Sequence, residues 1–242
     1  MTTARLAGKR VIVTGAGRGI GRAIADACLA AGAHVLLADI QPELLADIVD
    51  DATVQTCVVD VSALDDVRRM VEQARGHFGG VDVLVNNAGI GGTGQTLLEL
   101  TLADWERMLR VDVTSVFLCC QAVARLLIAQ GRGSIINISS ITGVEGTAGS
   151  VPYAAAKAGV LGLTKSLAKE LAPHAVNVNA IAPGLIDTEM SRARGQELAA
   201  KAVRWPRIGR PQDIAQLAVY LASDESEFVT GQVFGVNGGA HM

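Results

Sequence analysis

The sequence predicts an α/β fold in which a doubly wound, seven-stranded parallel sheet carries helices on both faces. Two observations support this fold class. Seven short apolar runs alternate with longer stretches of helical periodicity. The runs are apolar at successive positions, which is typical of strands buried on both faces. Right-handed crossovers then connect the parallel strands.

The expected elements follow one another along the chain. We expect strands at Lys9–Val13, His34–Ala38, Val54–Val59, Val81–Val85, Ser134–Ile138, Val176–Ile181 and Gln232–Val236. We expect helices at Gly19–Ala31, Pro42–Val49, Ala63–His77, Leu102–Gln130, Pro152–Leu171 and Gln212–Ala222. The irregular stretch Thr188–Arg210, which includes Gly195, is either a substrate lid or a plain surface excursion.

Length and composition favour one domain over residues 1–242. Half of the residues are hydrophobic, and the 21 basic and 24 acidic residues are well mixed, which disfavours nucleic acid as a partner. The four cysteines, Cys28, Cys57, Cys119 and Cys120, form no Cys-x-x-Cys pair, so we expect small hydrophobic side chains and no metal site. The N-terminal segment lacks a long apolar run, so we expect a soluble, cytoplasmic protein without a membrane partner.

A glycine-rich turn joins the first strand to the first helix. It reads Thr14-Gly15-Ala16-Gly17-Arg18-Gly19-Ile20-Gly21. Gly15 permits a tight turn, while Gly19 and Gly21 let the backbone approach a pyrophosphate closely. The start of the helix supplies free N–H groups to the anion. With a strand before it and a helix after it, this turn predicts a dinucleotide site that includes Arg18 and Ile20.

Asp39 closes the second expected strand, 18 residues after Gly21. A carboxylate at this place accepts hydrogen bonds from both adenine-ribose hydroxyls and repels a 2′-phosphate. Arg18 instead favours NADP, because a guanidinium in the glycine-rich turn could pair with a 2′-phosphate. We expect the repulsion to outweigh one flexible arginine, which favours NAD over NADP.

Tyr153 and Lys157 lie four residues apart in a helical stretch and therefore share a helix face. Reduction of a ketone needs an acid that protonates the developing alkoxide. A free tyrosine has a pKa of about 10, and a nearby ammonium favours its phenolate. Ser139 and Ser140 end the fifth strand, at the sheet edge where ligands bind in this architecture.

These motifs together resemble the short-chain dehydrogenase/reductase family in its compact single-domain branch, with a Rossmann-type fold. The matching stretches are the turn after Thr14, Asn86-Asn87-Ala88-Gly89, Ile135 to Gly159, Pro183 to Thr188, and Gly231 to Gly239. The resemblance implies that Ser140 donates to the substrate oxygen, that Tyr153 transfers the proton, and that Lys157 holds the nicotinamide ribose. It also implies a homotetramer and transfer of the pro-S hydride.

The resemblance also implies the remaining cofactor contacts. Asp60 and Val61 would lie against the adenine. The turn of Asn87, Ala88 and Gly89 would border the cofactor. In the loop of Pro183, Gly184, Ile186 and Thr188, the Ile186 backbone and the Thr188 hydroxyl would hold the carboxamide.

Asp112 departs from the family pattern. It occupies the place where the family carries an asparagine that kinks the long helix and holds a water of the proton relay to the lysine. An asparagine side chain both donates and accepts hydrogen bonds, whereas an ionised aspartate only accepts. We expect Asp112 to anchor the Lys157 ammonium, and we expect Asp112→Asn to keep activity but change the pH profile.

Candidate pocket residues are small or apolar, without a cation for a carboxylate. They are Gly91, Gly92, Thr142, Val144, Met190 and Leu198. They favour a small, neutral secondary alcohol or ketone as substrate of an NAD(H)-dependent oxidoreductase. The alternative is a 3-ketoacyl reductase that acts on an acyl carrier protein or CoA thioester, although the comparable edges offer only Arg132 and His174. A third reading is a non-catalytic NAD-binding sensor, against which the intact Ser140, Tyr153 and Lys157 argue.

Overall fold

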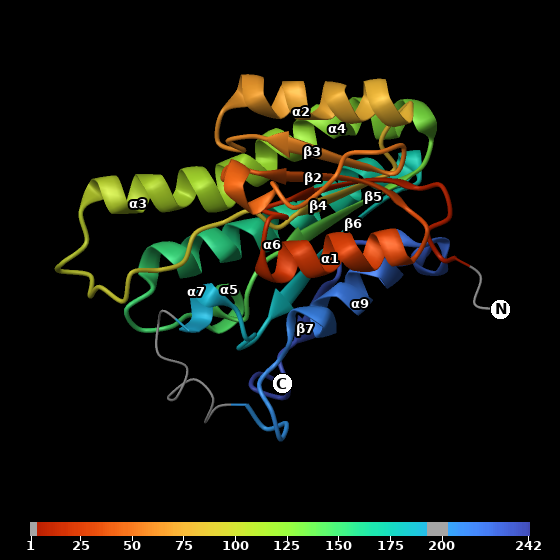
Figure 1. Cartoon of the computed structure of the whole chain (residues 1–242). Helices are drawn as coiled ribbons and strands as arrows, with labels where there is room; N and C mark the ends of the chain where they lie inside the picture. Colours follow the sequence, from red (N-terminus) through yellow and green to blue (C-terminus); the bar gives the residue numbers. More distant parts are fainter. Residues whose placement is uncertain (1–3, 193–202) are drawn as a thin grey trace.

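The computed structural model of the protein describes residues 4–192 and 203–242. Seven parallel strands form one sheet in the order β3-β2-β1-β4-β5-β6-β7 (Figure 1). The strands are β1 Arg10–Thr14, β2 His34–Asp39, β3 Val54–Val58, β4 Val83–Asn86, β5 Gly133–Ile138, β6 Val176–Pro183 and β7 Val233–Val236. The strand order reverses between β1 and β4, which is the switch point where ligands bind in such sheets. The predicted fold class is confirmed.

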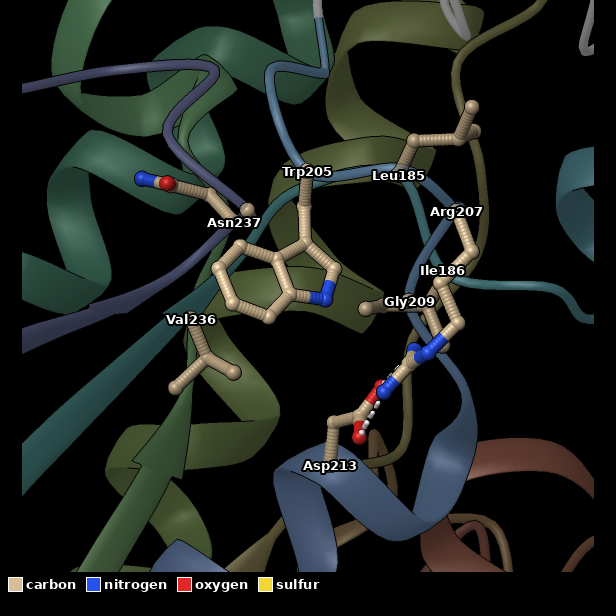
Figure 2. A pocket seen from close by; sticks show the side chains of 9 residues that line it. Leu185, Ile186, Trp205, Arg207, Gly209, Asp213, Val236 and Asn237 are labelled. Carbon is tan, nitrogen blue, oxygen red and sulfur yellow. Dashed lines mark hydrogen bonds and ion pairs between the residues drawn. The ribbon is translucent and has the colours of Figure 1, made fainter.

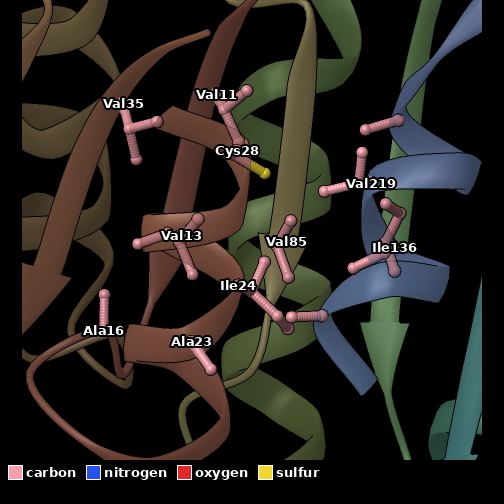
Figure 3. Close-up of a cluster of buried hydrophobic side chains, with 14 of the residues drawn as sticks. Val11, Val13, Ala16, Ala23, Ile24, Cys28, Val35, Val85, Ile136 and Val219 are labelled. Atoms are coloured by element: carbon pink, nitrogen blue, oxygen red, sulfur yellow. The ribbon is translucent and has the colours of Figure 1, made fainter. Parts of the chain in front are cut away.

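Helices cover both faces of the sheet (Figure 1). On one face lie α1 Gly19–Ala30 and α9 Pro211–Ala222, and the other is covered by α2 Leu64–Phe78, α4 Ser115–Gln130 and α6 Val151–Leu171. Alternate side chains of one strand reach opposite cores: Val11 and Val13 face α1, while Ile12 faces the other layer. Figure 3 shows the first core, in which Ile24 of α1 and Val219 of α9 meet the sheet.

The expected helix Leu102–Gln130 is interrupted. It consists of α3 Leu102–Leu109, a π-helical turn Arg110–Thr114, and α4. Ser115 N–H bonds to the Arg110 carbonyl, and the Ser115 hydroxyl donates to the Val111 carbonyl at 2.5 Å. π-Turns of this kind are frequent at functional sites. The turn carries Asp112, and it places that side chain inside the protein.

The helical segment Leu102–Gln130 is long and apolar enough, by length and composition alone, to cross a membrane. Its apolar side chains instead pack into the second core. Val116, Cys119 and Leu127 of α4 are at most 4% exposed and pack between this helix and the sheet. The segment is therefore a core helix of the domain.

The predicted helix Pro42–Val49 is wrong. The structure has only a 3₁₀ turn, Pro42–Leu44. The backbone of this segment makes turn bonds over three residues: the Leu45 N–H donates to the Pro42 carbonyl and the Ile48 N–H to the Leu45 carbonyl, both at 3.1 Å. These successive turns take the place of α-helical bonds over four residues.

The expected lid region is described only in part. A short helix, α7 Glu189–Arg192, begins it, and residues 193–202, which include Gly195 and Leu198, lie outside the described part. Beyond them, the N–H groups of Arg204 and Trp205 both donate to the Gly238 carbonyl at 2.9 Å. The region is thus tied to the C-terminal segment at its far end. Within residues 4–192 and 203–242, the remaining short helices are α5 Thr142–Glu145 and the 3₁₀ turns Ala172–His174 and Asp224–Ser226.

Candidate active site

The end of β5 and the start of α6 bring the three candidate catalytic residues to one edge of the sheet. Ser139 and Ser140 follow β5 directly, and the buried Ser139 hydroxyl donates to the Lys157 carbonyl at 2.9 Å. This bond ties the end of the strand to the helix that carries Tyr153 and Lys157. Ser140 is half-buried, and its hydroxyl oxygen accepts the Thr142 N–H at 3.1 Å. Ser139 therefore joins strand and helix, while Ser140 faces the edge.

Lys157 is buried among oxygen atoms. Its ammonium nitrogen donates to the Ile138 carbonyl at 3.2 Å and lies 3.1 Å from Asp112 Oδ2. The same nitrogen lies 5.6 Å from the centre of the Tyr153 ring. Burial lowers the pKa of Lys157, but the charges of Asp112 and Tyr153 outweigh burial and raise this pKa above its ordinary value. The lysine is thus held as a cation beside the tyrosine.

Asp112 is fully buried and reaches two donors. Its Oδ1 accepts the Ile90 N–H at 2.8 Å, and its Oδ2 faces the Lys157 ammonium. Gly89 makes room for this carboxylate, since a Cβ at Gly89 would lie 2.8 Å from Asp112 Oδ2. The structure therefore brings Asp112 to Lys157, as expected from the sequence, and adds the contact with Ile90, which no sequence pattern indicated.

The glycine-rich loop fits a dinucleotide. Gly15 has a φ of +62°, and a Cβ there would lie 2.8 Å from Ala88 Cα. A Cβ on Gly21 would collide with the Gly15 carbonyl. Arg18 precedes α1, and among the described residues no side chain caps that helix. The first N–H groups of α1, which include those of Gly19 and Ile20, therefore lie at a helix start suited to a pyrophosphate.

Asp39 lies directly beside this loop. Its carboxylate accepts the Gly17 N–H at 2.9 Å and the Gln41 N–H at 3.1 Å. Arg18, the one residue of this loop that favoured NADP in the sequence, pairs with Glu189 of α7. Both side chains of that pair are more than half exposed. The structure therefore fixes the Asp39 carboxylate beside the loop by hydrogen bonds, whereas the Arg18 side chain lies exposed at the surface.

Asn87 and Ala88 connect β4 to the loop through Thr14. The Thr14 hydroxyl oxygen accepts both of their N–H groups, at 3.0 and 3.1 Å, and the Asn87 amide donates to the carbonyls of Thr14 and Gly15. The turn that the sequence places beside the cofactor is therefore bonded to the glycine-rich loop.

A buried amide network joins the central strands, as the resemblance implies for the turn at Asn86, but its partners Asn137 and Thr164 were not predicted from the sequence. The Asn86 amide donates to Asn137 Oδ1 at 2.8 Å, and the Asn137 amide donates to the Thr164 hydroxyl at 2.9 Å. These three residues join β4, β5 and α6. Polar residues at core positions of two adjacent strands were the available signal.

The other expected cofactor contacts lie at the same carboxyl edge. Asp60 Oδ1 accepts the backbone and hydroxyl donors of Ser62 at 2.9 and 2.8 Å, and the adjacent Val61 is buried. Gly184 follows Pro183, the last residue of β6, and donates to the Val236 carbonyl at 3.0 Å. Beyond it, Ile186 is buried and Thr188 is half-buried. Each of these residues lies at or just after the carboxyl end of a strand.

Figure 2 shows a hollow behind the loop after β6. It is lined by Leu185, Ile186, Trp205, Arg207, Gly209, Asp213, Val236, Asn237 and Gly238. Arg207 and Asp213 close one side with an ion pair of 2.6 Å. The lining includes none of Ser140, Tyr153 and Lys157, so we assign no substrate to this hollow.

Comparisons with known proteins agree with this geometry. A family model described as Enoyl-(Acyl carrier protein) reductase matches residues 15–241. The chain belongs to the short-chain dehydrogenase/reductase family. It is 42% identical, over 97% of its length and 98% of the relative, to 3-oxoacyl-[acyl-carrier-protein] reductase FabG of Thermotoga maritima. It is 39% identical to the protein of the same name from Escherichia coli, with the same coverage of both chains.

A solved structure of the same family has the same fold. The structure of levodione reductase matches with a TM-score of 0.92 at 33% identity, and the match covers 97% of this chain and 98% of the other. Membership makes this chain an NAD(P)-dependent oxidoreductase. The relatives favour the ketoacyl reductase, which the sequence left as the alternative, over the small neutral alcohol dehydrogenase.

The four cysteine side chains are free thiols buried in the protein. Burial raises the pKa of the Cys28 and Cys120 thiols to about 12, so both are protonated near neutral pH. In the described ranges, no three His, Cys, Asp or Glu side chains cluster in a way that could hold a metal ion.

Proposed function

We propose that the protein is an NADH-dependent reductase of 3-oxoacyl thioesters. The observation that carries this proposal is the 39 to 42% identity, over whole chains, to relatives named 3-oxoacyl-[acyl-carrier-protein] reductase. Ser140, Tyr153 and Lys157 lie together at the carboxyl edge of the sheet, as such a reaction requires. The acyl carrier is an acyl carrier protein or CoA.

The residues around the loop would hold the dinucleotide. Gly15 and Gly21 let the loop pack closely on itself and on the turn after β4, so that the backbone at Gly19 would face the pyrophosphate, and Asp39 would bind the adenine ribose and reject a 2′-phosphate. The turn after β4 and the loop Pro183 to Thr188 would border the nicotinamide. When bound, NADH supplies the hydride, which the family resemblance assigns as pro-S.

The proton chemistry belongs to this chain's own side chains. Ser140 donates a hydrogen bond to the substrate carbonyl oxygen and polarises it. Tyr153 delivers its phenolic proton to the oxygen as the alkoxide charge develops. Lys157, a buried cation close to the Tyr153 ring, stabilises the phenolate that is left and binds the ribose.

A second candidate is the reduction of a small neutral ketone. Val144 and Met190, two candidate pocket residues, expose apolar side chains at 45 and 46%. The candidate pocket residues supply no cation, and the solved structure of levodione reductase resembles this one. The expectation that Arg132 lies beside the active-site mouth is wrong, because Arg132 precedes β5 at the opposite edge of the sheet, where it is exposed and lies 3.9 Å from Asp82.

One experiment separates the two candidates. NADH oxidation is followed with a short 3-oxoacyl-CoA and, separately, with cyclic and aryl ketones of similar size. We expect kcat/KM for the thioester to exceed that for the ketones by at least about tenfold. A reversed ratio assigns the protein to small ketones. Size-exclusion chromatography with light scattering tests the homotetramer that the family resemblance implies.

A further inference from the structure

A buried carboxylate stands beside the proposed proton-transfer pair. Asp112 has no exposed surface, and the Lys157 side chain is 6% exposed. Asp112 Oδ2 and Lys157 Nζ are 3.1 Å apart, and Lys157 Nζ lies 5.6 Å from the Tyr153 ring centre. The three groups therefore form one chain of charges from the π-turn to the phenol.

The two oxygen atoms of Asp112 have different surroundings. Oδ1 accepts the Ile90 N–H, while the buried Oδ2 makes no hydrogen bond within the described residues and lies 3.1 Å from Lys157 Nζ as the partner of an ion pair. An asparagine has a single acceptor oxygen, so its amide nitrogen would face one of these two donors. A carboxylate therefore sets a negative charge directly against the Lys157 ammonium, which an asparagine amide would not do.

We propose that Asp112 is a positioning residue that pairs directly with Lys157 and thereby raises the pH at which the Tyr153–Lys157 pair releases protons. The pair of Asp112 and Lys157 has almost no net charge. An ammonium without this carboxylate would present a full positive charge to the phenol and favour the phenolate at lower pH. The proposal rests on the proposed function, because it assigns proton transfer to Tyr153.

In the described part of the chain, the other buried charged side chains, Asp39 and Asp82, do not lie on the elements packed against the pair. Charged groups on the elements packed against the pair lie at the surface or at helix ends. Asp104 caps the start of α3, Glu106, Arg107 and Arg110 are exposed, and Glu145 of α5 pairs with His241 at 3.0 Å. The loop after β4 contributes the Ile90 N–H and no ionisable group.

The experiment is a spectroscopic titration of the protein without cofactor or substrate. The chain has two tyrosines, Tyr153 and Tyr220, so tyrosinate absorbance resolves into two transitions at most. Tyr153→Phe identifies the transition that belongs to Tyr153. We expect D112N to move this transition about one pH unit lower than in the wild type. The alkaline limb of NADH-dependent reduction should move in the same direction.

D82N is the matched control. Asp82 is also a buried carboxylate, bound to Arg10 at 2.7 Å, but it precedes β4 at the opposite edge of the sheet. We expect D82N to leave the Tyr153 transition in place. If D112N does not fold, as judged by circular dichroism, D112A removes the same charge and must give the same shift.

An unchanged or higher midpoint in the folded Asp112 variant overturns the proposal. This result is distinguishable from a failure of the proposed function, because the titration needs no turnover. A shifted midpoint without activity on thioesters would leave the pairing intact and reject the substrate assignment. Thioester turnover with an unshifted midpoint would support the substrate assignment and reject the proposed role of Asp112.

Discussion

Asp39 is the residue on which the proposed preference for NADH depends. Its buried carboxylate is held beside the glycine-rich loop by the N–H groups of Gly17 and Gln41. Replacement by asparagine keeps the shape and removes the charge that would repel a 2′-phosphate.

We predict that Asp39→Asn raises the ratio of NADPH to NADH affinity by at least about tenfold. Fluorescence titration with both nucleotides measures this ratio. Asp47→Asn is the control, because Asp47 is an exposed carboxylate paired with Arg22 at 3.2 Å. An Asp39→Asn protein with the wild-type ratio would show that another group selects the cofactor.

At the level of elements, periodicity predicted most of the architecture. The seven strands lie within two residues of their expected positions at nearly every boundary, because buried parallel strands are continuous apolar runs. Periodicity does not report a π-turn, since one extra residue leaves the apolar face of Leu102–Gln130 almost unchanged. It also predicted an α-helix at Pro42–Val49, where the backbone instead forms successive turns, with bonds from Leu45 to Pro42 and from Ile48 to Leu45.

The candidate site was predictable where a motif marks it, and not where tertiary contacts complete it. The glycine-rich turn and the Tyr153–Lys157 spacing are visible as patterns in the sequence. The Arg18–Glu189 pair and the Ile90–Asp112 bond join segments far apart along the chain, so no local pattern could indicate them.

The amide network of Asn86, Asn137 and Thr164 connects the elements that carry Ser140 and Tyr153. We predict that Asn137→Ala lowers the free energy of unfolding by about 2 kcal/mol, because it leaves buried partners in β4 and α6 unsatisfied. Urea unfolding measures this change. Asn177→Ala is the control, since Asn177 is half-buried and bonds outside the network. Equal losses in the two variants would contradict a special role for the network.

On the scale of the whole molecule, ion pairs link the amino ends of the central strands, at the edge of the sheet that lies opposite the candidate active site. Burial raises the pKa of Asp82, but hydrogen bonds from Arg10 outweigh burial and hold this pKa below its usual range. At the carboxyl edge, hydrogen bonding to Arg207 also lowers the pKa of Asp213. A carboxyl group with a lowered pKa in the folded state stabilises the fold above its unfolded pKa of about 3.9.

We therefore predict that the free energy of unfolding falls as the pH is lowered below about 4, through the lowered folded-state pKa values. Urea unfolding at a series of pH values from about 7 to about 3 measures this dependence. Asp82→Asn should show a shallower loss in acid than the wild type. An identical slope in both proteins would remove the Arg10–Asp82 pair from the account.

The whole arrangement places one nucleotide loop and one Ser–Tyr–Lys set at the carboxyl edge of a single sheet. NADH consumption with a short 3-oxoacyl-CoA, compared between the wild type and Tyr153→Phe, tests the consequence most directly. We predict turnover by the wild type and a loss of at least about a hundredfold in the variant, with NADH affinity retained. Wild-type protein that binds NADH but reduces no substrate, or a variant as fast as the wild type, would contradict the account.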